Sequence, residues 1–596
     1  MSAKMPSPRT PASAQPSQPA PRDDSQPSAL TQLDRSLHAQ LAHLTQGISP
    51  TSVVGAYMDW FTHLAISPGR QTELLLKAQR KAARLALHAA HGPDSCHTAC
   101  IDPLPQDRRF DAPEWRQWPY HLMAQAFLLN QQWWHSATSD VPGVSAHHEH
   151  LATFFTRQWL DMCSPSNFLW TNPEVLAETA RSGGANLVQG AKNRAADLLR
   201  LANGQPPPAM QEFRPGHEVA ITPGQVVFRN HLIEVIQYTP QTSTVFAEPV
   251  LMVPSWIMKF YILDLSPHNS LVRYLVEQGH TVFMVSWRNP DGQDRELGMD
   301  NYLQDGVMAA LDAVGDIMPK RRVQALGYCL GGTLLSIAAA ALARDGDERL
   351  KSVTLLASEL DFTEPGELGL FIDESQLAYL DDVMGEKGYL DGKQMAGAFA
   401  MLNSRDLVWS RMEHEYLMGR PLPVSDLIAW NADATRMPMR QHHEYLHQLY
   451  LHNDLAEGRY RVGGRPVALT DIRVPVFALG TQRDTVSPWH SVYKIHLLTD
   501  TELTFCLTSG GHNVGVVNPP EPGVPRSYQI AQHAASDRYQ DPEAWAATAP
   551  AHPGSWWPAW TQWLRHQSGR RVAPPALGGA AATHLGDAPG RYVLMT

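Results

Sequence analysis

The segment RRVQALGYCLGGTLLSIAAAAL, Arg321–Leu342, decides the fold of this protein. It starts as a short apolar run typical of a buried strand and ends as an alanine-rich run typical of a helix. Between them, Gly327-Tyr328-Cys329-Leu330-Gly331 has the spacing G-x-S-x-G, in which a strand turns sharply into a helix and presents one reactive side chain. Cysteine stands where serine is usual, so we predict that Cys329 is a thiol nucleophile.

Similar apolar runs recur around this segment and predict a sheet. They are PVLMVPSW from Pro249, TVFMVSW from Thr281, KSVTLLAS from Lys351, VPVFALG from Val474 and ELTFCLTSG from Glu502. Helical segments separate several of them, which is typical of a parallel sheet covered on both faces. A hairpin with its turn at Asn230 precedes them. The alternation lapses into helix-like sequence between about 362 and 465, and we expect this insertion to form a lid over the strand ends.

The part of the chain before the sheet has a different character. Residues 1–29 are rich in Pro, Ser and Gln, which predicts a disordered tail. From Leu30, leucines recur at helical spacing, and the pattern over 30–215 predicts an all-helical N-terminal domain. Its Trp and Phe stripe fits either ordinary helix packing or the docking of an apolar partner. A proline-rich linker near Pro206 then leads into the catalytic domain, residues 216–596.

Composition narrows the possible classes of protein. The chain has 596 residues, 43% of them hydrophobic and 18% charged, and this is the composition of a globular protein. Its formal net charge of -11 argues against nucleic-acid binding. The 5 scattered cysteines fit a reducing compartment, and the first thirty residues lack the apolar core of a secretion signal. No apolar run reaches the length of a transmembrane segment, so we predict a cytoplasmic protein.

Two further residues complete a catalytic constellation. In α/β-hydrolase folds the acid and the histidine follow the nucleophile in the chain, on loops after late strands. Asp484 follows the strand-like VPVFALG, and His512 lies beside Gly511 just after ELTFCLTS. His512 is then the base that takes the thiol proton of Cys329, and Asp484 orients the imidazole. We therefore predict an α/β-hydrolase catalytic domain.

The choice of cysteine indicates the type of reaction. The backbone N–H of Leu330 is one expected oxyanion donor, and the second is expected from Ile257 or its neighbour Trp256, after PVLMVP. A serine acylated by a thioester gives an oxygen ester, a downhill step that favours hydrolysis. A cysteine gives another thioester and keeps the acyl group activated, which suits transfer to an alcohol.

With these residues placed, the chain resembles the polyhydroxyalkanoate synthases, and class I most closely. The resemblance rests on an ordered set of motifs over most of the chain: DRRF at Asp107, SPSNFLWTNPEVL at Ser164, SGGANLVQG at Ser182, KFYILDLSPHNSLVRYLVEQGHTVFMVSWRNPDG at Lys259, GYCLGG at Gly327, DLVWSRMEHEYL at Asp406, WNADATRMP at Trp430, GHNVGVVNPP at Gly511, GSWWPAWTQWL at Gly554 and APGRYV at Ala588.

The resemblance implies an acyltransferase that polymerises (R)-3-hydroxyacyl-CoA into polyhydroxyalkanoate with release of CoA. It implies no cofactor beyond the CoA thioester substrate, and a homodimer at the surface of cytoplasmic granules, in contact with the growing polyester and with granule-associated proteins. Cys329, Asp484 and His512 match the family's triad, and Leu330 and Ile257 match its oxyanion positions.

This chain departs from the family pattern at three places. Met258 stands where Asn is common, Thr485 where a His usually follows the aspartate, and GHNVG at Gly511 replaces GHIAG. These changes leave the triad intact and bear on substrate range.

Two other functions fit parts of the sequence. A dienelactone-hydrolase-like esterase also carries GYCLGG, but that class lacks the helical N-terminal region and the large insertion. An idle granule-coating protein would use the Leu and Trp stripes alone. A thioester assay distinguishes the three functions: a synthase forms polymer and CoA, an esterase releases free acid, and a granule-coating protein shows no turnover. No metal is predicted, because CHTAC at Cys96 and HHEH at His147 each offer one short cluster without the second half of a zinc site.

The composition of the tail predicts the outcome of a truncation. Removing residues 1–25 should leave folding and thioester turnover nearly unchanged, because this stretch cannot bury a core. Removing the chain through residue 215 should abolish granule binding or activity. CoA release measures turnover, and granule sedimentation measures granule binding. Loss of turnover from the short deletion would contradict the prediction.

Overall fold

The computed structural model describes residues 29–45, 47–92, 99–104, 107–402, 404, 408–421, 424–581 and 584–596. The predicted disordered tail and Cys96 lie outside these residues, apart from residue 29. Within them, no helix combines the length and the apolar composition needed to cross a membrane.

The N-terminal part is built from helices, as predicted. Its helices are α1 (Ala29–Thr45), α2 (Pro50–Ala65), α3 (Pro68–Ala90), α4 (Tyr120–Thr138), α5 (Ala146–Met162), α6 (Pro173–Ser182), α7 (Ala185–Ala202) and α8 (Pro208–Glu212). Local sequence sets their ends. Ser49 caps α2 by accepting from Ser52 N, and Asn172 caps α6 with Pro173 in its first turn. No strand occurs among the described residues before Gly224.

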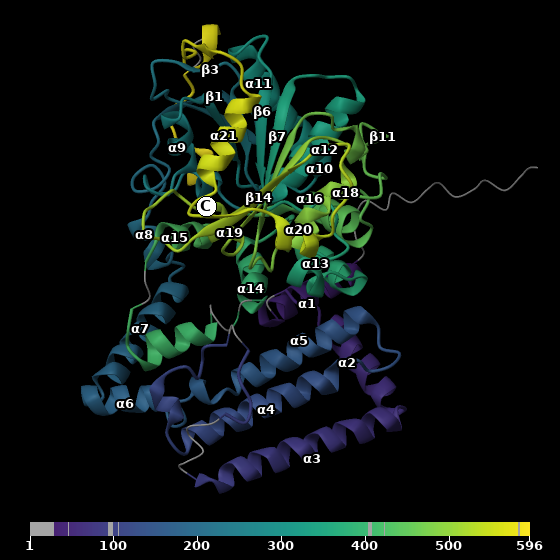
Figure 1. Ribbon diagram of the computed structural model, residues 1–596, viewed down its shortest axis with the longest axis vertical. Coiled ribbons are helices and arrows are strands. Elements are labelled where there is room, and N and C mark those ends of the chain that lie inside the picture. The colour runs from purple at the N-terminus through teal and green to yellow at the C-terminus, as the bar shows by residue number, and fades with distance from the viewer. Residues whose placement is uncertain are drawn as a thin grey trace, which may run out of the picture.

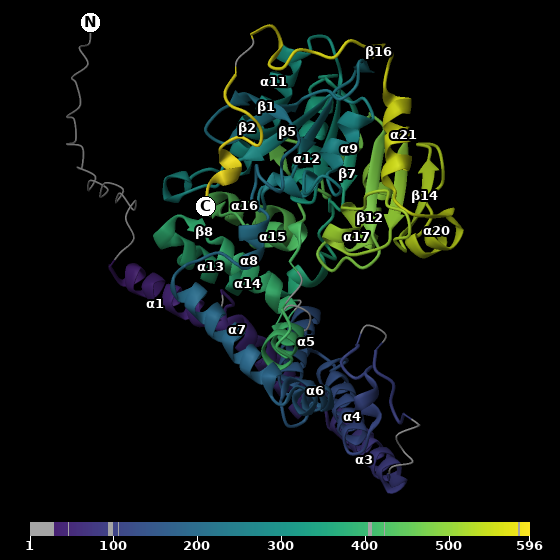
Figure 2. The ribbon, with the colours of Figure 1, turned by 90° about the vertical axis from the view of Figure 1, so that its left-hand side faces the viewer.

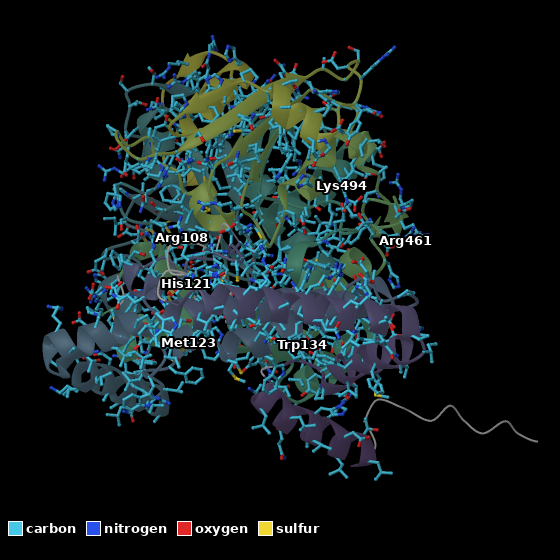
Figure 3. The ribbon with its side chains drawn as sticks, turned by 60° about the horizontal axis from the view of Figure 1, so that its bottom comes forward. Arg108, His121, Met123, Trp134, Arg461 and Lys494 are labelled. Carbon is cyan, nitrogen blue, oxygen red and sulfur yellow. The ribbon has the colours of Figure 1, made fainter. Side chains whose placement is uncertain are left out.

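Helices α2–α5 lie across one end of the molecule, and the sheet occupies the other (Figure 1). Helix α1 runs between them, beneath α13 (Glu374–Lys387) (Figure 2). Figure 3 brings the helical end forward, with His121, Met123 and Trp134 of α4 on it. The N-terminal part therefore covers one end of the sheet-bearing part.

The sheet has ten strands in the order β1-β2-β5-β4-β6-β7-β12-β13-β14-β15. Their bounds are β1 (Gly224–Arg229), β2 (Ile233–Tyr238), β4 (Val250–Val253), β5 (Val282–Trp287), β6 (Val323–Tyr328), β7 (Leu350–Leu356), β12 (Val476–Thr481), β13 (Leu503–Thr508), β14 (Ser527–His533) and β15 (Ala551–Pro553). The six strands from β5 to β13 are parallel, and antiparallel pairs extend both edges. The predicted strands and the Asn230 hairpin are confirmed, whereas β14 and β15 were not predicted.

Both faces of the sheet are buried, as a parallel sheet requires. Along β4, Leu251 and Val253 pack on the side that holds α12 (Leu330–Arg344), while Val250 and Met252 face the opposite side. That opposite side is covered by α9 (Leu271–Glu277) and α21 (Trp557–Gln567). Each fully buried Val or Leu contributes about 1.5–3 kcal/mol, so the alternation holds the strands in register.

The insertion after β7 is helical and lies between the sheet and the N-terminal helices. Its elements are η7 (Gly366–Phe371), α13, β8 (Tyr389–Leu390), α14 (Gly392–Leu402), η9 (Met412–Leu417), α15 (Asp426–Ala432), β9 (Met437–Pro438), α16 (Met439–Tyr445) and η10 (Leu446–Leu451). The helical character predicted for this segment is confirmed. Its role as a lid stays a prediction.

Gln376 of α13 attaches the N-terminal helices to this insertion. Its side chain is 3% exposed, accepts from Ser49 N at 2.7 Å and donates through Nε2 to Gly47 O at 2.7 Å. Both backbone groups belong to the buried turn between α1 and α2, so one amide satisfies two groups that would otherwise be buried without partners.

The substitution Gln376→Leu should loosen this turn. It leaves Ser49 N and Gly47 O buried without partners, each at a cost of about 1–3 kcal/mol. We expect exchange of the Ser49 amide, measured by hydrogen–deuterium exchange, to accelerate roughly tenfold or more. Amides of the sheet serve as the internal control. Unchanged protection at Ser49 would show that packing alone holds the turn.

Candidate active site

Cys329 lies at a strained turn between β6 and α12. Its φ is +52°, a left-handed value that few non-glycine residues adopt. Two glycines make the turn possible. A Cβ on Gly331 would come within 2.2 Å of Val253 O, and one on Gly327 would come within 2.3 Å of Gly332 Cα. The chain therefore turns directly from strand to helix and presents the Cys329 side chain at the carboxyl end of the sheet.

His512 and Asp484 reach the same edge from neighbouring strands. Asp484 follows β12, and His512 begins α19 (His512–Val516) after β13. The His512 Nδ1 and Asp484 Oδ2 atoms are 2.8 Å apart, and Cys329 is among the groups that raise the pKa of His512. The structure thus brings the three predicted catalytic residues together at one edge of the sheet.

The Asp484 carboxylate is held rigidly by further donors. Its Oδ1 accepts from Val486 N at 2.9 Å and from Ser487 N at 2.8 Å, and Thr481 Oγ1 donates to Oδ2 at 2.8 Å. Hydrogen bonds to a charged acceptor contribute more than neutral ones, about 1.5–3 kcal/mol each. These donors fix the carboxylate, which in turn orients the ring of His512.

Burial and charge act in opposite directions on this pair. Burial alone would raise the pKa of Asp484, but the charge of His512 and the hydrogen bonds outweigh it and hold that pKa below its ordinary value. Burial lowers the pKa of His512, but Asp484 and Cys329 outweigh it and raise it well above its ordinary value. The site therefore favours an imidazole ring that gains a proton.

The two predicted oxyanion residues also lie close together. Leu330 is the first residue of α12, and Ile257 follows β4. Both line a single pocket of about 130 Å³ beside the Cys329 turn. Trp256, the alternative to Ile257, is 2% exposed, and its carbonyl accepts from Thr435 Oγ1 at 3.0 Å.

The pocket is lined mostly by apolar side chains from three parts of the chain. The α1–α2 turn contributes Gly47 and Ile48. The remaining residues, apart from Ile257 and Leu330, come from the insertion: Leu368, Phe371, Ile372, Gln376, Leu380, Leu390, Gln394, Met395, Met437, His442, Tyr445, Leu446 and Tyr450. Burial lowers the pKa of His442 to about 3, so its ring is neutral here. Sequence patterns within one segment do not show which distant segments meet, so the contribution of Ile48 to this pocket was not predicted.

The three departures from the family pattern have defined places. Met258 forms an isolated β-bridge with Ala434. The carbonyl of Thr485 accepts from Glu367 N at 3.0 Å. Asn513, in GHNVG, accepts from the buried Tyr328 hydroxyl at 2.6 Å, and the Tyr328 ring lies 5.6 Å from that of His512. Asn513 thus fixes the hydroxyl of the residue that precedes Cys329.

The histidines considered for metal binding have carboxylate partners. His147 lies 3.2 Å from Asp373, and His148 lies 2.6 Å from Asp59. Elsewhere among the described residues, Asp381, His443 and His447 offer three possible ligand atoms within 4.8 Å of one another. This group was not predicted from the sequence. The spacing of His443 and His447, one helical turn apart, is the sequence signal that could have indicated it. The three residues lie on α13, α16 and η10.

Comparisons with known proteins give a consistent result. The family model for the poly-beta-hydroxybutyrate polymerase (PhaC) N-terminus matches residues 106–275, that for the poly-beta-hydroxybutyrate polymerase N terminal matches 28–70, and that for the alpha/beta hydrolase fold matches 248–519. The solved structures that resemble the chain include a monoacylglycerol lipase of Paleococcus ferrophilus, at 13% identity and a TM-score of 0.31, covering 56% of this chain and 99% of that one.

The curated relatives match over most of the chain. The poly(3-hydroxyalkanoate) polymerase of Methylorubrum extorquens is 42% identical, over 83% of this chain and 82% of the relative. The poly(3-hydroxyalkanoate) polymerase subunit PhaC of Rhizobium etli is 39% identical, over 83% and 78%. The subunit of the same name from Cupriavidus necator is 40% identical, over 82% and 83%.

The opposed pKa shifts predict how stability depends on pH. The raised pKa of His512 means that its stabilisation is full below the ordinary value of 6.5 and is lost as the pH rises through the raised value. The lowered pKa of Asp484 means that its stabilisation is present above 3.8 and is lost as the pH falls. Asp484→Asn should therefore lower the melting temperature most near pH 6, by about 2–4 °C, and less at alkaline pH, where His512 loses its proton. Thermal melts across this range test it, and an equal difference at both ends would contradict it.

Proposed function

The chain belongs to the poly(3-hydroxyalkanoate) polymerase family, and we propose that it polymerises (R)-3-hydroxyacyl-CoA thioesters into polyester with release of CoA. The observation that supports this proposal is the close placement of Cys329, His512 and Asp484 beside an apolar pocket. Members of this family are acyltransferases of the α/β-hydrolase superfamily, and the pocket suits an acyl chain.

In the first step, Cys329 is acylated. His512 accepts the thiol proton, and the sulfur attacks the thioester carbonyl of the substrate. The negative charge on the carbonyl oxygen is stabilised by the backbone N–H groups of Leu330 and Ile257. The C–S bond to CoA then breaks, and His512 returns the proton to the leaving CoA thiolate. Asp484 supports the charged imidazole throughout.

In the second step, the chain grows by one unit. The 3-hydroxyl of another acyl group attacks the acyl-Cys329 thioester, and His512 accepts the hydroxyl proton. An ester bond forms, the C–S bond to Cys329 breaks, and the sulfur regains a proton from His512. Because the acyl group stays on sulfur until this attack, its activation is kept for transfer to the alcohol. The nucleophile, the base and the oxyanion donors all come from the chain, so the proposed reaction uses no cofactor and no metal.

The apolar surface of the N-terminal helices supports association with a polyester granule in the cytoplasm. Leu30, Leu33, Leu37 and Leu44 of α1 are 75%, 66%, 53% and 83% exposed. Trp159, Phe168 and Trp170 are exposed as well. Apolar surface on this scale favours contact with an apolar phase or a partner. The proposal includes a homodimer and contacts with granule-associated proteins. It also includes a role as a lid for the insertion that lines the pocket.

Substitution of the nucleophile tests the proposed function. Cys329→Ala should abolish CoA release from 3-hydroxybutyryl-CoA, because no other group at the turn can accept the acyl chain. Cys329→Ser should retain little activity, because a hydroxyl ionises far less readily than a thiol. CoA release, measured with a thiol reagent, and polymer formation, measured by turbidity, give the result.

Cys163 supplies the matched control. It is an exposed cysteine at the end of α5, and Cys163→Ala should keep full activity. Wild-type release of CoA by Cys329→Ala would end the proposal, and release of free acid in place of polymer by the wild type would assign the chain to hydrolysis.

A further inference from the structure

A buried carboxyl that the proposed reaction does not use lies beside the nucleophile. Glu359 is 4% exposed, and its Oε1 atom is enclosed with no hydrogen-bond partner among the described residues. Buried carboxyl groups in folded proteins nearly always have such a partner, because an unpaired one costs free energy. Glu359 Oε1 therefore remains an acceptor that no described residue satisfies.

The path of the chain places Glu359 at the nucleophile turn. Strand β7 pairs with β6, and Cys329 N donates to Leu356 O at 2.9 Å. At Ala357 the chain leaves the sheet in a left-handed conformation, with a φ of +48°. Two residues later, the carbonyl of Glu359 accepts from Thr333 Oγ1 of α12 at 2.8 Å. The backbone of Glu359 is thus fixed against the first turn of the helix that Cys329 precedes.

The surroundings of the carboxyl are the groups of the proposed active site. Burial first, and then the charges of Asp484 and Cys329, raise the pKa of Glu359 well above its ordinary value. This rise favours the protonated carboxyl, a neutral acid that can donate one hydrogen bond and accept others. A neutral acid does not serve as a base, and His512 already has that role.

The polar groups near Glu359 are engaged with one another. Lys494, the nearby cation, donates to Thr363 Oγ1 at 2.6 Å and pairs with Glu364 at 2.8 Å. The Tyr445 hydroxyl donates to that of Tyr450 at 3.0 Å. None of these contacts reaches the Glu359 carboxyl, so a ligand group can serve as its partner.

A neutral acid selects a neutral group that both donates and accepts. The phosphates of CoA need cations, and the thioester carbonyl is met by the N–H groups of Leu330 and Ile257 in the proposed mechanism. The remaining polar group near the thioester of a 3-hydroxyacyl substrate is its hydroxyl.

We propose that the Glu359 carboxyl binds the 3-hydroxyl of the substrate acyl group and positions it beside Cys329. This inference rests on the proposed polymerase function and adds the group by which the site distinguishes a hydroxyacyl thioester from a plain acyl thioester. A site built to hydrogen-bond a hydroxyl discriminates strongly against the analogue that lacks it, because its own polar group is then left unpaired.

The test compares two substrates that differ only in the hydroxyl. The full chain is mixed with 3-hydroxybutyryl-CoA or with butyryl-CoA, and acylation of Cys329 is followed by intact-protein mass and CoA release. The wild type should prefer the hydroxylated substrate by a factor on the order of 100. Glu359→Leu should reduce this preference roughly tenfold or more and leave the rate with butyryl-CoA nearly unchanged.

Glu359→Gln is the matched control, because the amide keeps the size of the side chain and its ability to donate and accept. It should keep most of the preference. The butyryl-CoA rate reports in each variant that the protein is folded and that Cys329 is reactive, so a folding defect is separated from a loss of recognition.

The remaining outcomes distinguish the proposed polymerase function from the role proposed for Glu359. An unchanged preference in Glu359→Leu would overturn the inference and assign the carboxyl to a water molecule alone. An equal loss with both substrates would overturn it as well and assign Glu359 to support of the turn. No acylation of the wild type by either substrate would end the proposed function, and this inference with it.

Discussion

The close approach of backbone to backbone at the Cys329 turn is the constraint on which the rest of this structure depends. A residue with a side chain adopts a positive φ there only because Gly327 and Gly331 let the helix start directly against neighbouring strands. This contact places Cys329 at the carboxyl edge of the sheet. Asp484 and His512 reach the same edge because parallel strands end there, so the loops that follow these strands converge.

Three parts of the chain together form the pocket beside this turn. The sheet part supplies Ile257 and Leu330, the insertion supplies most of the wall, and the turn between α1 and α2 supplies Ile48. Gln376 couples the last two parts by bonding both Gly47 O and Ser49 N. The helical part and the pocket wall are therefore in direct contact through the α1–α2 turn and Gln376.

Two buried carboxyl groups near Cys329 show how partners decide charge. Asp484 accepts hydrogen bonds from backbone and side-chain donors and lies against an imidazole, so its pKa falls despite burial. Glu359 is equally enclosed but has no partner for its Oε1, so burial prevails and its pKa rises. The surroundings thus favour the ionised form of Asp484 and the protonated form of Glu359, and only an ionised carboxyl can stabilise a charged histidine.

The sequence by itself determined the elements and the identity of the reactive groups. Strand period, glycine spacing and the order of Cys329, Asp484 and His512 are local properties of the chain, so they predicted six parallel strands and the residues that meet at their ends. The edge strands β14 and β15 were not predicted, because β14 is only half-buried and β15 is a three-residue exposed strand, so neither carries a strong alternating signal. Tertiary structure alone decided that Ile48 lines the pocket, that Gln376 joins two parts of the chain, and that Glu359 is left unpaired. These features depend on contacts between segments separated by as many as 329 residues, and no local pattern encodes which distant partner fills a site or leaves it empty.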